Sequence, residues 1–202
     1  LYTGFTECLV DDQLIDQFYS GEPVKLEVNE KLYPNQYLML VSSSNPKKTA
    51  LSRYEGKSGL MHKIREVKHP IWGVRPRNKE QAFAMDLLLD PKVPFVSLIG
   101  KAGSGKTLCA LAAGLAQVLD ESEKPQYKRL VVSRPVMPMG DLGFLPGSLE
   151  EKMAPWLAPV QDNLQFLMGD KATLELYMEK GVIDIEALTY IRGRSISNAY
   201  VI

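Results

Sequence analysis

The chain has 202 residues, of which 45% are hydrophobic and 24% are charged, and its formal net charge is zero. These values are ordinary for a folded globular protein and exclude a disordered chain. A net charge of zero also excludes a bulk electrostatic attraction to nucleic acid or to an anionic membrane, so any such binding needs a local patch. The length allows one large domain or a full domain with a smaller companion, and we expect the second arrangement.

The cysteines and the apolar runs indicate a cytoplasmic protein. Cys8 and Cys109 are too few for a disulfide scaffold or a cysteine-rich zinc site, and they suit a reducing compartment. No run approaches the roughly 20 apolar residues that a membrane helix needs, and the N-terminus has no signal-peptide pattern. We expect no membrane partner. Because the chain starts at Leu1 and stops on the apolar run Tyr200–Ile202, we also expect it to be a piece of a longer protein.

The first third of the chain alternates short apolar runs with turn residues. Val24–Val28 and Tyr37–Val41 predict strands, and Ser42–Lys48 predicts the clearest loop. Ile71–Arg77, which contains Gly73 and Pro76, predicts a connection to a second domain. We therefore expect a small β-rich connector module over residues 1–72 and a second domain over 73–202.

From Asn78 the pattern changes to alternating helices and strands. Asn78 predicts a helix cap, and the helix that follows runs to Pro91. Val93–Ile99, apolar on both faces, predicts a central strand of a parallel sheet, and Thr107–Leu119 predicts the next helix. Further elements are predicted as a strand over 130–133, helices over 148–168 and 171–180, and a strand over 199–202. This order is typical of an α/β doubly wound sheet with right-handed crossovers.

A phosphate-binding motif stands between the predicted strand and helix. Gly100–Thr107 satisfies G-x-x-x-x-G-K-[ST], whose glycines let backbone N–H groups turn inward around an anion at a helix N-terminus. We expect Lys106 to contact the β and γ phosphates of ATP and the Thr107 hydroxyl to bind Mg²⁺, which makes these two the candidate catalytic residues. The candidate nucleotide-binding residues are Gln81, Gly100, Lys101, Ala102, Gly103, Ser104, Gly105, Lys106 and Thr107.

Gln81 has two interpretations. Its amide has a donor and an acceptor that match the N6 and N7 edge of adenine. It also lies three residues after Asn78, where a glutamine completes a helix capping box. The residue pattern alone leaves both interpretations open.

Three arginines are candidates for phosphate or RNA contacts. Arg134 follows a predicted strand, where loops line the site in open α/β sheets. Arg192 and Arg194 flank Gly193 and suit the phosphate of a polynucleotide or of a nucleotide held by a neighbouring subunit, with an exposed ion-paired turn as the alternative. Hydrolysis also needs a carboxylate that holds magnesium, and none is visible where it is expected. We therefore expect this chain to bind nucleotide without being a complete ATPase.

Together these motifs resemble the PhoH family of P-loop ATPases over residues 73–202. The segments that carry the resemblance are Arg77–Gln81, Gly100–Thr107, Ser133–Pro135, Pro138–Gly147, Glu150–Lys152, Pro155–Trp156, Pro159, Asp162–Leu164 and Ile191–Arg194. Upstream, Tyr33–Asn35 and Ser52–Tyr54 resemble the connector that precedes this domain in fusions with an N-terminal PIN nuclease domain. Residues 1–70 show no acidic nuclease cluster of their own.

The resemblance implies a RecA-like parallel sheet with flanking helices, ATP and Mg²⁺ as cofactors, and ring-shaped homo-oligomers, among which we consider a hexamer. In the PIN fusions it implies ATP-driven RNA unwinding coupled to RNA cleavage. Gln81 matches the adenine-reading glutamine of the family, Gly100–Thr107 its Walker A loop, and Arg134 the arginine after the second strand. The family's acidic Walker B segment is expected directly after Ile202.

Two functions from different classes follow. The first is the motor domain of an ATP-dependent RNA helicase, a hydrolase whose partner is single-stranded RNA. The alternative is an ATP-binding regulatory or assembly domain that oligomerises without unwinding nucleic acid. A small-molecule kinase shares the P-loop but is disfavoured because Gly140–Leu164 matches the PhoH pattern. Within that stretch, Phe144–Pro146 has two interpretations, contact with RNA bases or packing.

Overall fold

The structure is a computed structural model that describes residues 4–26, 31–119, 125–135, 149–187 and 195–202, without the side chains of 149–154 and 156. The chain falls into two compact units. The first unit consists of residues 1–66 and 77–86, and the second unit consists of residues 67–76 and 87–202. The domain boundary expected after residue 72 stays a prediction. The elements are β1 (Phe5–Val10), α1 (Asp12–Tyr19), β2 (Val24–Lys25), β3 (Tyr37–Ser42), β4 (Thr49–Glu55), β5 (Leu60–Lys63), α2 (Lys79–Leu88), α3 (Lys106–Val118), β6 (Arg129–Arg134), α4 (Leu149–Met168), α5 (Lys171–Glu179), β7 (Ile183–Ala187) and β8 (Ala199–Val201).

The first unit is built on a five-stranded sheet with the strand order β1-β3-β4-β5-β2. Strand β1 runs parallel to β3, whereas the pairs β3–β4, β4–β5 and β5–β2 are antiparallel. The strand predicted at Tyr37–Val41 is confirmed as β3, and the strand predicted from Val24 is limited to Val24–Lys25 in the described residues. Helix α1, which the sequence interpretation did not include, lies in the crossover between the parallel strands β1 and β3.

The core of this unit lies between α1 and one face of the sheet. Ile15 and Phe18, three residues apart on α1, are 0% and 1% exposed. Leu38 and Leu40 alternate on β3 and point to the same face, so both are fully buried. The apolar residues of this core cluster are Val10, Ile15, Phe18, Val24, Leu38, Leu40, Ala50 and Met61.

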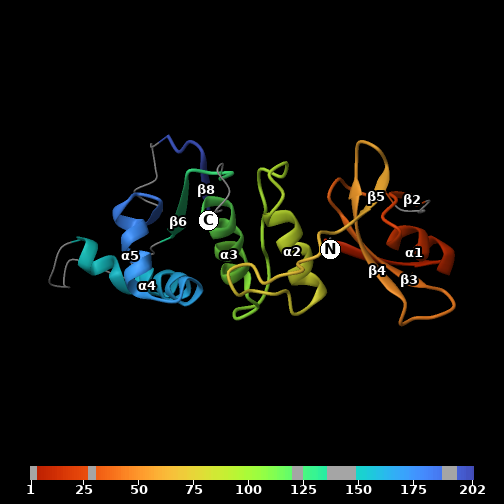
Figure 1. The fold of residues 1–202 in the computed structure, drawn as a ribbon, viewed down its shortest axis with the longest axis horizontal. Coiled ribbons are helices and arrows are strands. Elements are labelled where there is room, and N and C mark those ends of the chain that lie inside the picture. The colour runs from red at the N-terminus through yellow and green to blue at the C-terminus, as the bar shows by residue number, and fades with distance from the viewer. Residues whose placement is uncertain (1–3, 27–30, 120–124, 136–148, 188–194) are drawn as a thin grey trace. The chain divides into compact units, whose positions relative to one another are not determined.

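The second unit contains a parallel sheet of the order β7-β6-β8 (Figure 1). Helix α3 packs against β6 and β8, and α4 packs against α3, α5, β6 and β7. The central strand β6 is apolar on both faces, and Leu130, Val131 and Val132 are all buried, as expected for a strand covered by helices. The predicted helices and the strands at β6 and β8 are thus confirmed, and β7 is an additional strand. Within the described residues, no helix has the length and apolar character that a membrane crossing requires.

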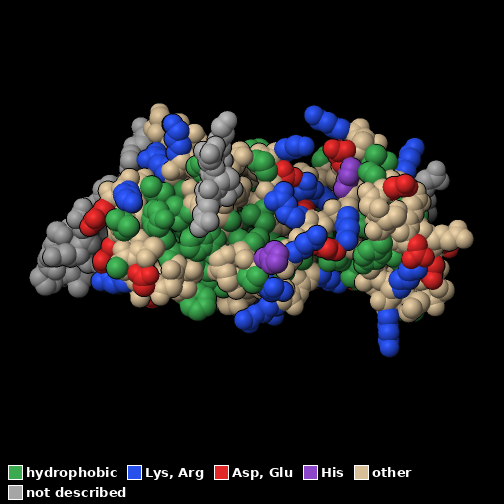
Figure 2. Space-filling model, viewed as in Figure 1, with side chains coloured by type: hydrophobic (Ala, Val, Ile, Leu, Met, Phe, Trp, Pro, Cys, Tyr) green, Lys and Arg blue, Asp and Glu red, His purple; other side chains and the backbone are tan. Residues whose placement is uncertain are grey.

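One predicted strand is wrong. Val93–Ile99, expected as a central strand, is not a strand, and Phe95 and Ile99 are 83% and 95% exposed. An extended segment becomes a strand only when a neighbour takes up its backbone hydrogen bonds, and no described strand pairs with this one. Val201, on strand β8, is also half exposed. Figure 2 shows hydrophobic side chains gathered on the visible face around β6, β8 and α3.

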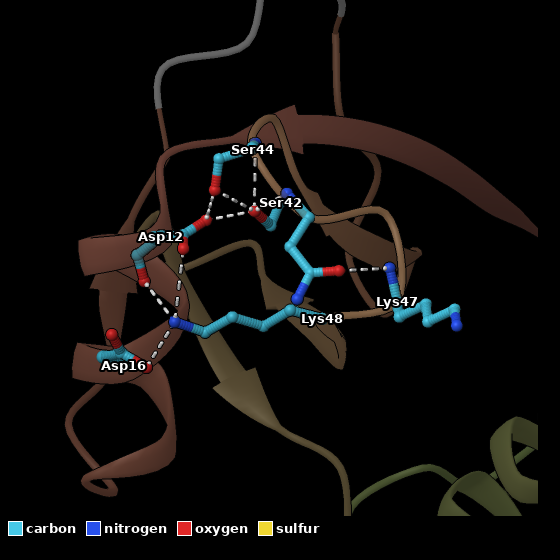
Figure 3. A network of polar contacts seen from close by, with 7 residues as sticks. Asp12, Asp16, Ser42, Ser44, Lys47 and Lys48 are labelled. Atoms are coloured by element: carbon cyan, nitrogen blue, oxygen red, sulfur yellow. Dashed lines mark hydrogen bonds and ion pairs between the residues drawn. The ribbon is translucent and has the colours of Figure 1, made fainter.

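The predicted loop Ser42–Lys48 is joined to α1 by a polar network (Figure 3). Asp12, in the first turn of α1, accepts hydrogen bonds from the hydroxyls of Ser42 and Ser44, the second at 2.8 Å. Lys48 Nζ lies 2.7 Å from Asp16 Oδ1 and 3.7 Å from Asp12 Oδ2. The Ser42 hydrogen bond is the largest of the effects that hold the pKa of Asp12 below its ordinary value.

Candidate functional site

The loop between Gly100 and helix α3 depends on two glycines with left-handed backbone. Gly103 has φ of 76° and Gly105, the N-cap of α3, has φ of 85°. A Cβ built on Gly103 would meet no atom within 4 Å, so glycine is required here by its backbone angle and not by lack of space. The motif thus folds as its glycine pattern predicts, into a tight turn that leads directly into a helix.

Lys106 folds back over this turn. Its Nζ donates to the carbonyl oxygens of Gly100 at 2.8 Å and Lys101 at 2.7 Å, and lies 3.3 Å from the Ser104 hydroxyl. An ammonium group has three N–H donors, so these three loop oxygens can accept all of the hydrogen bonds that the Lys106 ammonium group donates. They are neutral acceptors, whereas phosphate oxygens are charged and form shorter and stronger hydrogen bonds with an ammonium group. A bound phosphate would therefore compete well for Lys106.

The first turn of α3 has the properties of an anion site. Gly105 has no side chain with which to cap the N-terminal N–H groups, and residues 100–104 and 107 are exposed. The first hydrogen bond inside the helix runs from Cys109 N–H to Gly105 O at 2.9 Å. The preceding N–H groups add to the partial positive charge of the helix terminus, which favours a phosphate at this position.

The helix behind this loop is held firmly in the second unit. Gly114 faces β6 and β8 so closely that a Cβ on it would lie 2.8 Å from Leu130 Cδ1 and 3.0 Å from Tyr200 Cδ1. The carbonyl oxygen of Leu88 accepts from both Gln117 Nε2 at 2.9 Å and the Tyr200 hydroxyl at 3.1 Å. These contacts fix α3 against the end of α2 and against β8. The hydrogen bonds to the Leu88 carbonyl join residues 29 and 112 positions apart, and the sequence analysis did not predict them.

The metal-binding candidate is Thr107, which is exposed in the first turn of α3. A threonine hydroxyl suits Mg²⁺, which keeps most of its water when bound beside phosphates. The described residues contain no group of three or more His, Cys, Asp or Glu side chains that would hold a metal ion by themselves. The residues present therefore fit a magnesium ion that is bound together with a nucleotide, with Thr107 as one ligand.

Gln81 is engaged as a helix cap in this structure. Its backbone N–H donates to Asn78 Oδ1 at 2.8 Å, and its own Oε1 accepts from the backbone N–H of Arg77 at 2.8 Å. The capping interpretation thus describes the observed contacts, with the Gln81 side chain accepting from Arg77 N–H. Adenine recognition stays a prediction. Gln81 belongs to the first unit and Gly100–Thr107 to the second, and each is described within its own unit.

The arginine candidates are only partly placed. Arg134 is the last residue of β6, at the carboxyl end of the parallel sheet, and is half-buried. The adjacent Ser133 hydroxyl is buried and has no hydrogen-bond partner among the described residues. Arg192 and Arg194 lie outside the described residues, as does Phe144–Pro146. Their predicted contacts therefore stay predictions.

Comparison with known proteins gives a consistent result. The family described as "PhoH-like protein" matches residues 73–202. The chain is 40% identical over 208 residues to "Protein PhoH2" of Bacillus subtilis (strain 168) and 39% identical over 205 residues to "Protein PhoH2" of Mycolicibacterium smegmatis; in both, the alignment covers all of this chain. It covers 46% and 44% of those two proteins, so the chain spans about half their length. A "PhoH-like protein" of Bacillus subtilis (strain 168) is 41% identical over 105 residues, or 52% of this chain and 31% of that protein.

Proposed function

Because this chain belongs to the family of PhoH-like proteins, we propose that Gly100–Thr107 binds the phosphates of Mg²⁺-ATP in an ATP-driven motor that acts on single-stranded RNA. The observation that carries the proposal is the geometry of Lys106, whose ammonium is held on neutral loop oxygens at the exposed N-terminus of a well-packed helix. The RecA-like sheet, the cytoplasmic location and a ring of identical subunits belong to the same proposal.

The chain's own residues would divide the work in the following way. The turn at Gly103 and Gly105 and the first N–H groups of α3 bind phosphate oxygens, and Lys106 moves from the loop carbonyls to the β and γ phosphates. Thr107 holds magnesium, which neutralises charge on the phosphates when bound. Gln81 reads the base, and Arg134, Arg192 and Arg194 contact phosphate or RNA. Hydrolysis and unwinding are proposed for the full-length protein.

Nucleotide binding tests the first step. We expect Lys106→Ala to weaken ATP binding by about tenfold to a hundredfold, because a hydrogen bond to a charged group contributes about 1.5–3 kcal/mol. Lys92→Ala is the matched control, because it removes one exposed lysine of the same unit at a position outside Gly100–Thr107. Titration calorimetry with ATP and Mg²⁺ measures both. Equal affinity of the Lys106 variant and the wild type would contradict the proposal.

A second measurement separates the motor from an assembly domain. Single-stranded RNA binding that weakens steeply with salt supports the motor, since phosphate contacts release counterions. Oligomerisation on ATP without RNA affinity supports the ATP-binding regulatory or assembly domain. Light scattering and fluorescence anisotropy on the same samples measure both properties.

A further inference from the structure

Residues 71–74 form a tight turn within the second unit. Ile71 N–H donates to the Val74 carbonyl and Val74 N–H donates to the Ile71 carbonyl, both at 2.9 Å, so these two residues form an isolated antiparallel bridge. Val74 is 8% exposed and Ile71 is half-buried, and their side chains anchor the turn. Trp72 and Gly73 therefore stand at its tip. The segment 67–76 groups with 87–202, so the turn belongs to the same unit as the phosphate loop.

Trp72 has an unfavourable backbone conformation for a bulky residue. Its φ is 48° and that of Gly73 is 78°, and positive angles at both central positions are typical of a two-residue type I′ turn. Glycine and asparagine are preferred at these positions, because a larger side chain is disfavoured in the left-handed region. Backbone strain of this kind is concentrated at functional sites, where the surrounding fold maintains it. The strain at Trp72 therefore indicates a use of this side chain beyond closing the turn.

The indole ring of Trp72 is half-buried and still has binding capacity. Within the described chain it stacks on no other aromatic ring and lies under no cation. Its N–H has no hydrogen-bond partner among the same residues and remains accessible to water. A tryptophan that only fills a core normally pairs its N–H. Trp72 thus keeps an unstacked ring and a free donor in a fixed turn.

Exposed basic side chains flank this turn. Lys68, His69 and Arg75 are exposed, and none of them has an ion-pair partner among the residues that the structure describes. Residues 67–76 contain no Asp or Glu. An aromatic ring between unpaired cations suits a single nucleic-acid strand, because its bases can stack on the ring while its phosphates contact the cations. An acidic peptide would use the cations but would leave the strained, unstacked ring without a role.

We propose that the turn at Ile71–Val74 is a contact site for single-stranded RNA, in which Trp72 stacks on a base and Lys68 and Arg75 bind neighbouring phosphates. The inference rests on the proposed RNA-dependent motor, and it adds residues to the RNA surface beyond the three arginines proposed above. It also gives this connecting segment a binding function. Because stacking requires an unpaired base, Trp72 favours single strands, whereas Lys68 and Arg75 bind the phosphates of single and paired strands alike.

Fluorescence anisotropy tests this site on the full chain. The probes are a labelled oligouridylate and the same oligouridylate paired with oligoadenylate, each titrated at several salt concentrations. The variants are Trp72→Leu, which keeps apolar volume without an aromatic ring, Trp72→Phe, which keeps an aromatic ring, and the double variant Lys68→Gln/Arg75→Gln. The double variant changes only exposed residues, so it preserves the test if Trp72→Leu fails to fold by circular dichroism.

The second unit offers matched controls for both kinds of change. Phe166, on α4, is 74% exposed, so Phe166→Leu removes an accessible aromatic ring outside the turn. Lys92 and Lys128 are exposed residues of the same unit. Lys92→Gln/Lys128→Gln therefore removes the same charge as Lys68→Gln/Arg75→Gln and leaves the turn intact.

We expect Trp72→Leu to weaken binding of the single strand about tenfold, with the salt slope unchanged and with little effect on the paired strand. Trp72→Phe should retain most of the wild-type affinity. Lys68→Gln/Arg75→Gln should reduce the slope of the logarithm of the association constant against the logarithm of salt concentration by about 1.4, since each phosphate contact of a single strand contributes about 0.7. The control variants should keep the wild-type preference for the single strand and the wild-type slope.

A folded Trp72→Leu variant with wild-type RNA affinity, or a double variant with the wild-type slope, would overturn this inference and leave the proposed motor standing. Equal losses in the control variants would overturn it as well, because the effect would not belong to the turn. Calorimetric titration with ATP and Mg²⁺ adds one distinction: a Trp72→Leu variant that loses ATP affinity and keeps RNA affinity would assign the ring to the nucleotide. A wild-type chain that binds no RNA would overturn the RNA part of the proposed function and this inference with it.

Discussion

The close packing of helix α3 against β6 and β8 predicts that Gly114→Ala destabilises the fold. Alanine is favoured over glycine inside a helix by about 1 kcal/mol, so propensity alone would stabilise the variant. The new Cβ, however, would lie 2.8 Å from Leu130 Cδ1 and 3.0 Å from the Tyr200 ring, and Leu130 is fully buried. Overpacking of a core costs about 1–3 kcal/mol, and these distances place the site in the upper part of that range. We expect a net loss of about 1–2 kcal/mol in the free energy of unfolding.

Guanidinium unfolding followed by circular dichroism measures this loss, and two further variants separate its components. Ala116→Gly, a partly exposed position on the same helix, calibrates helix propensity and should cost about 1 kcal/mol. Leu130→Val removes the methyl group nearest the new Cβ at a cost of about 1 kcal/mol. The double variant Gly114→Ala/Leu130→Val should then be more stable than the sum of the single changes by about 1 kcal/mol. A stabilised Gly114→Ala, or strict additivity with Leu130→Val, would refute the steric reasoning.

Two other predictions concern single hydrogen bonds and acid stability. Tyr200→Phe should lower the free energy of unfolding by about 0.5–1.5 kcal/mol, which is the net value of one hydrogen bond, because Gln117 still donates to the Leu88 carbonyl. Thermal unfolding measures this loss. A loss above this range would contradict the assignment of Leu88 as an acceptor shared by Gln117 and Tyr200. The Ser42 hydroxyl is the main cause of the lowered pKa of Asp12, and Thr173 N–H is the main cause of the lowered pKa of Asp170. Each ionised carboxylate therefore stabilises the fold at a pH above the ordinary carboxyl pKa of about 3.9. This stabilisation is lost as the pH falls through the lower pKa of the folded state. Asp12→Asn should therefore flatten the fall in stability below about pH 4, and an unchanged acid profile would contradict that assignment.

Local patterns predicted the phosphate loop well because its structure is set by neighbouring residues. The positive φ values at Gly103 and Gly105 and the start of α3 at Lys106 depend on a few consecutive positions, all visible in the motif. The helices α2, α3, α4 and α5 were similarly predictable from caps and apolar spacing. Helix α1 had a usable signal too, since Ile15 and Phe18 recur at helical spacing, but the surrounding turn residues favoured an all-strand interpretation.

Features that depend on distant partners were not predictable. The apolar segment Val93–Ile99 has the composition of a buried strand, but pairing is a property of two segments and is absent for this one within the described chain. Asp86 is a similar case: in the sequence it is one acidic residue in an apolar helix, and its partners Tyr37, Arg53 and Arg65 lie 49, 33 and 21 residues away. An acidic residue among the apolar residues of a helix was the signal available in the sequence, although it does not identify the partners.

The two interpretations of Gln81 are compatible in this geometry. A carboxamide has two acceptor lone pairs and two N–H donors, and the contact with Arg77 N–H uses one of the oxygen lone pairs. That contact restricts the rotation of the amide and so settles which end is the acceptor and which is the donor. Adenine presents an amino group beside a ring nitrogen, and an amide with a fixed orientation recognises that pair at a lower entropic cost than a rotating one. In the nucleotide-binding function proposed above, the cap would therefore also orient the Gln81 amide for recognition of the base.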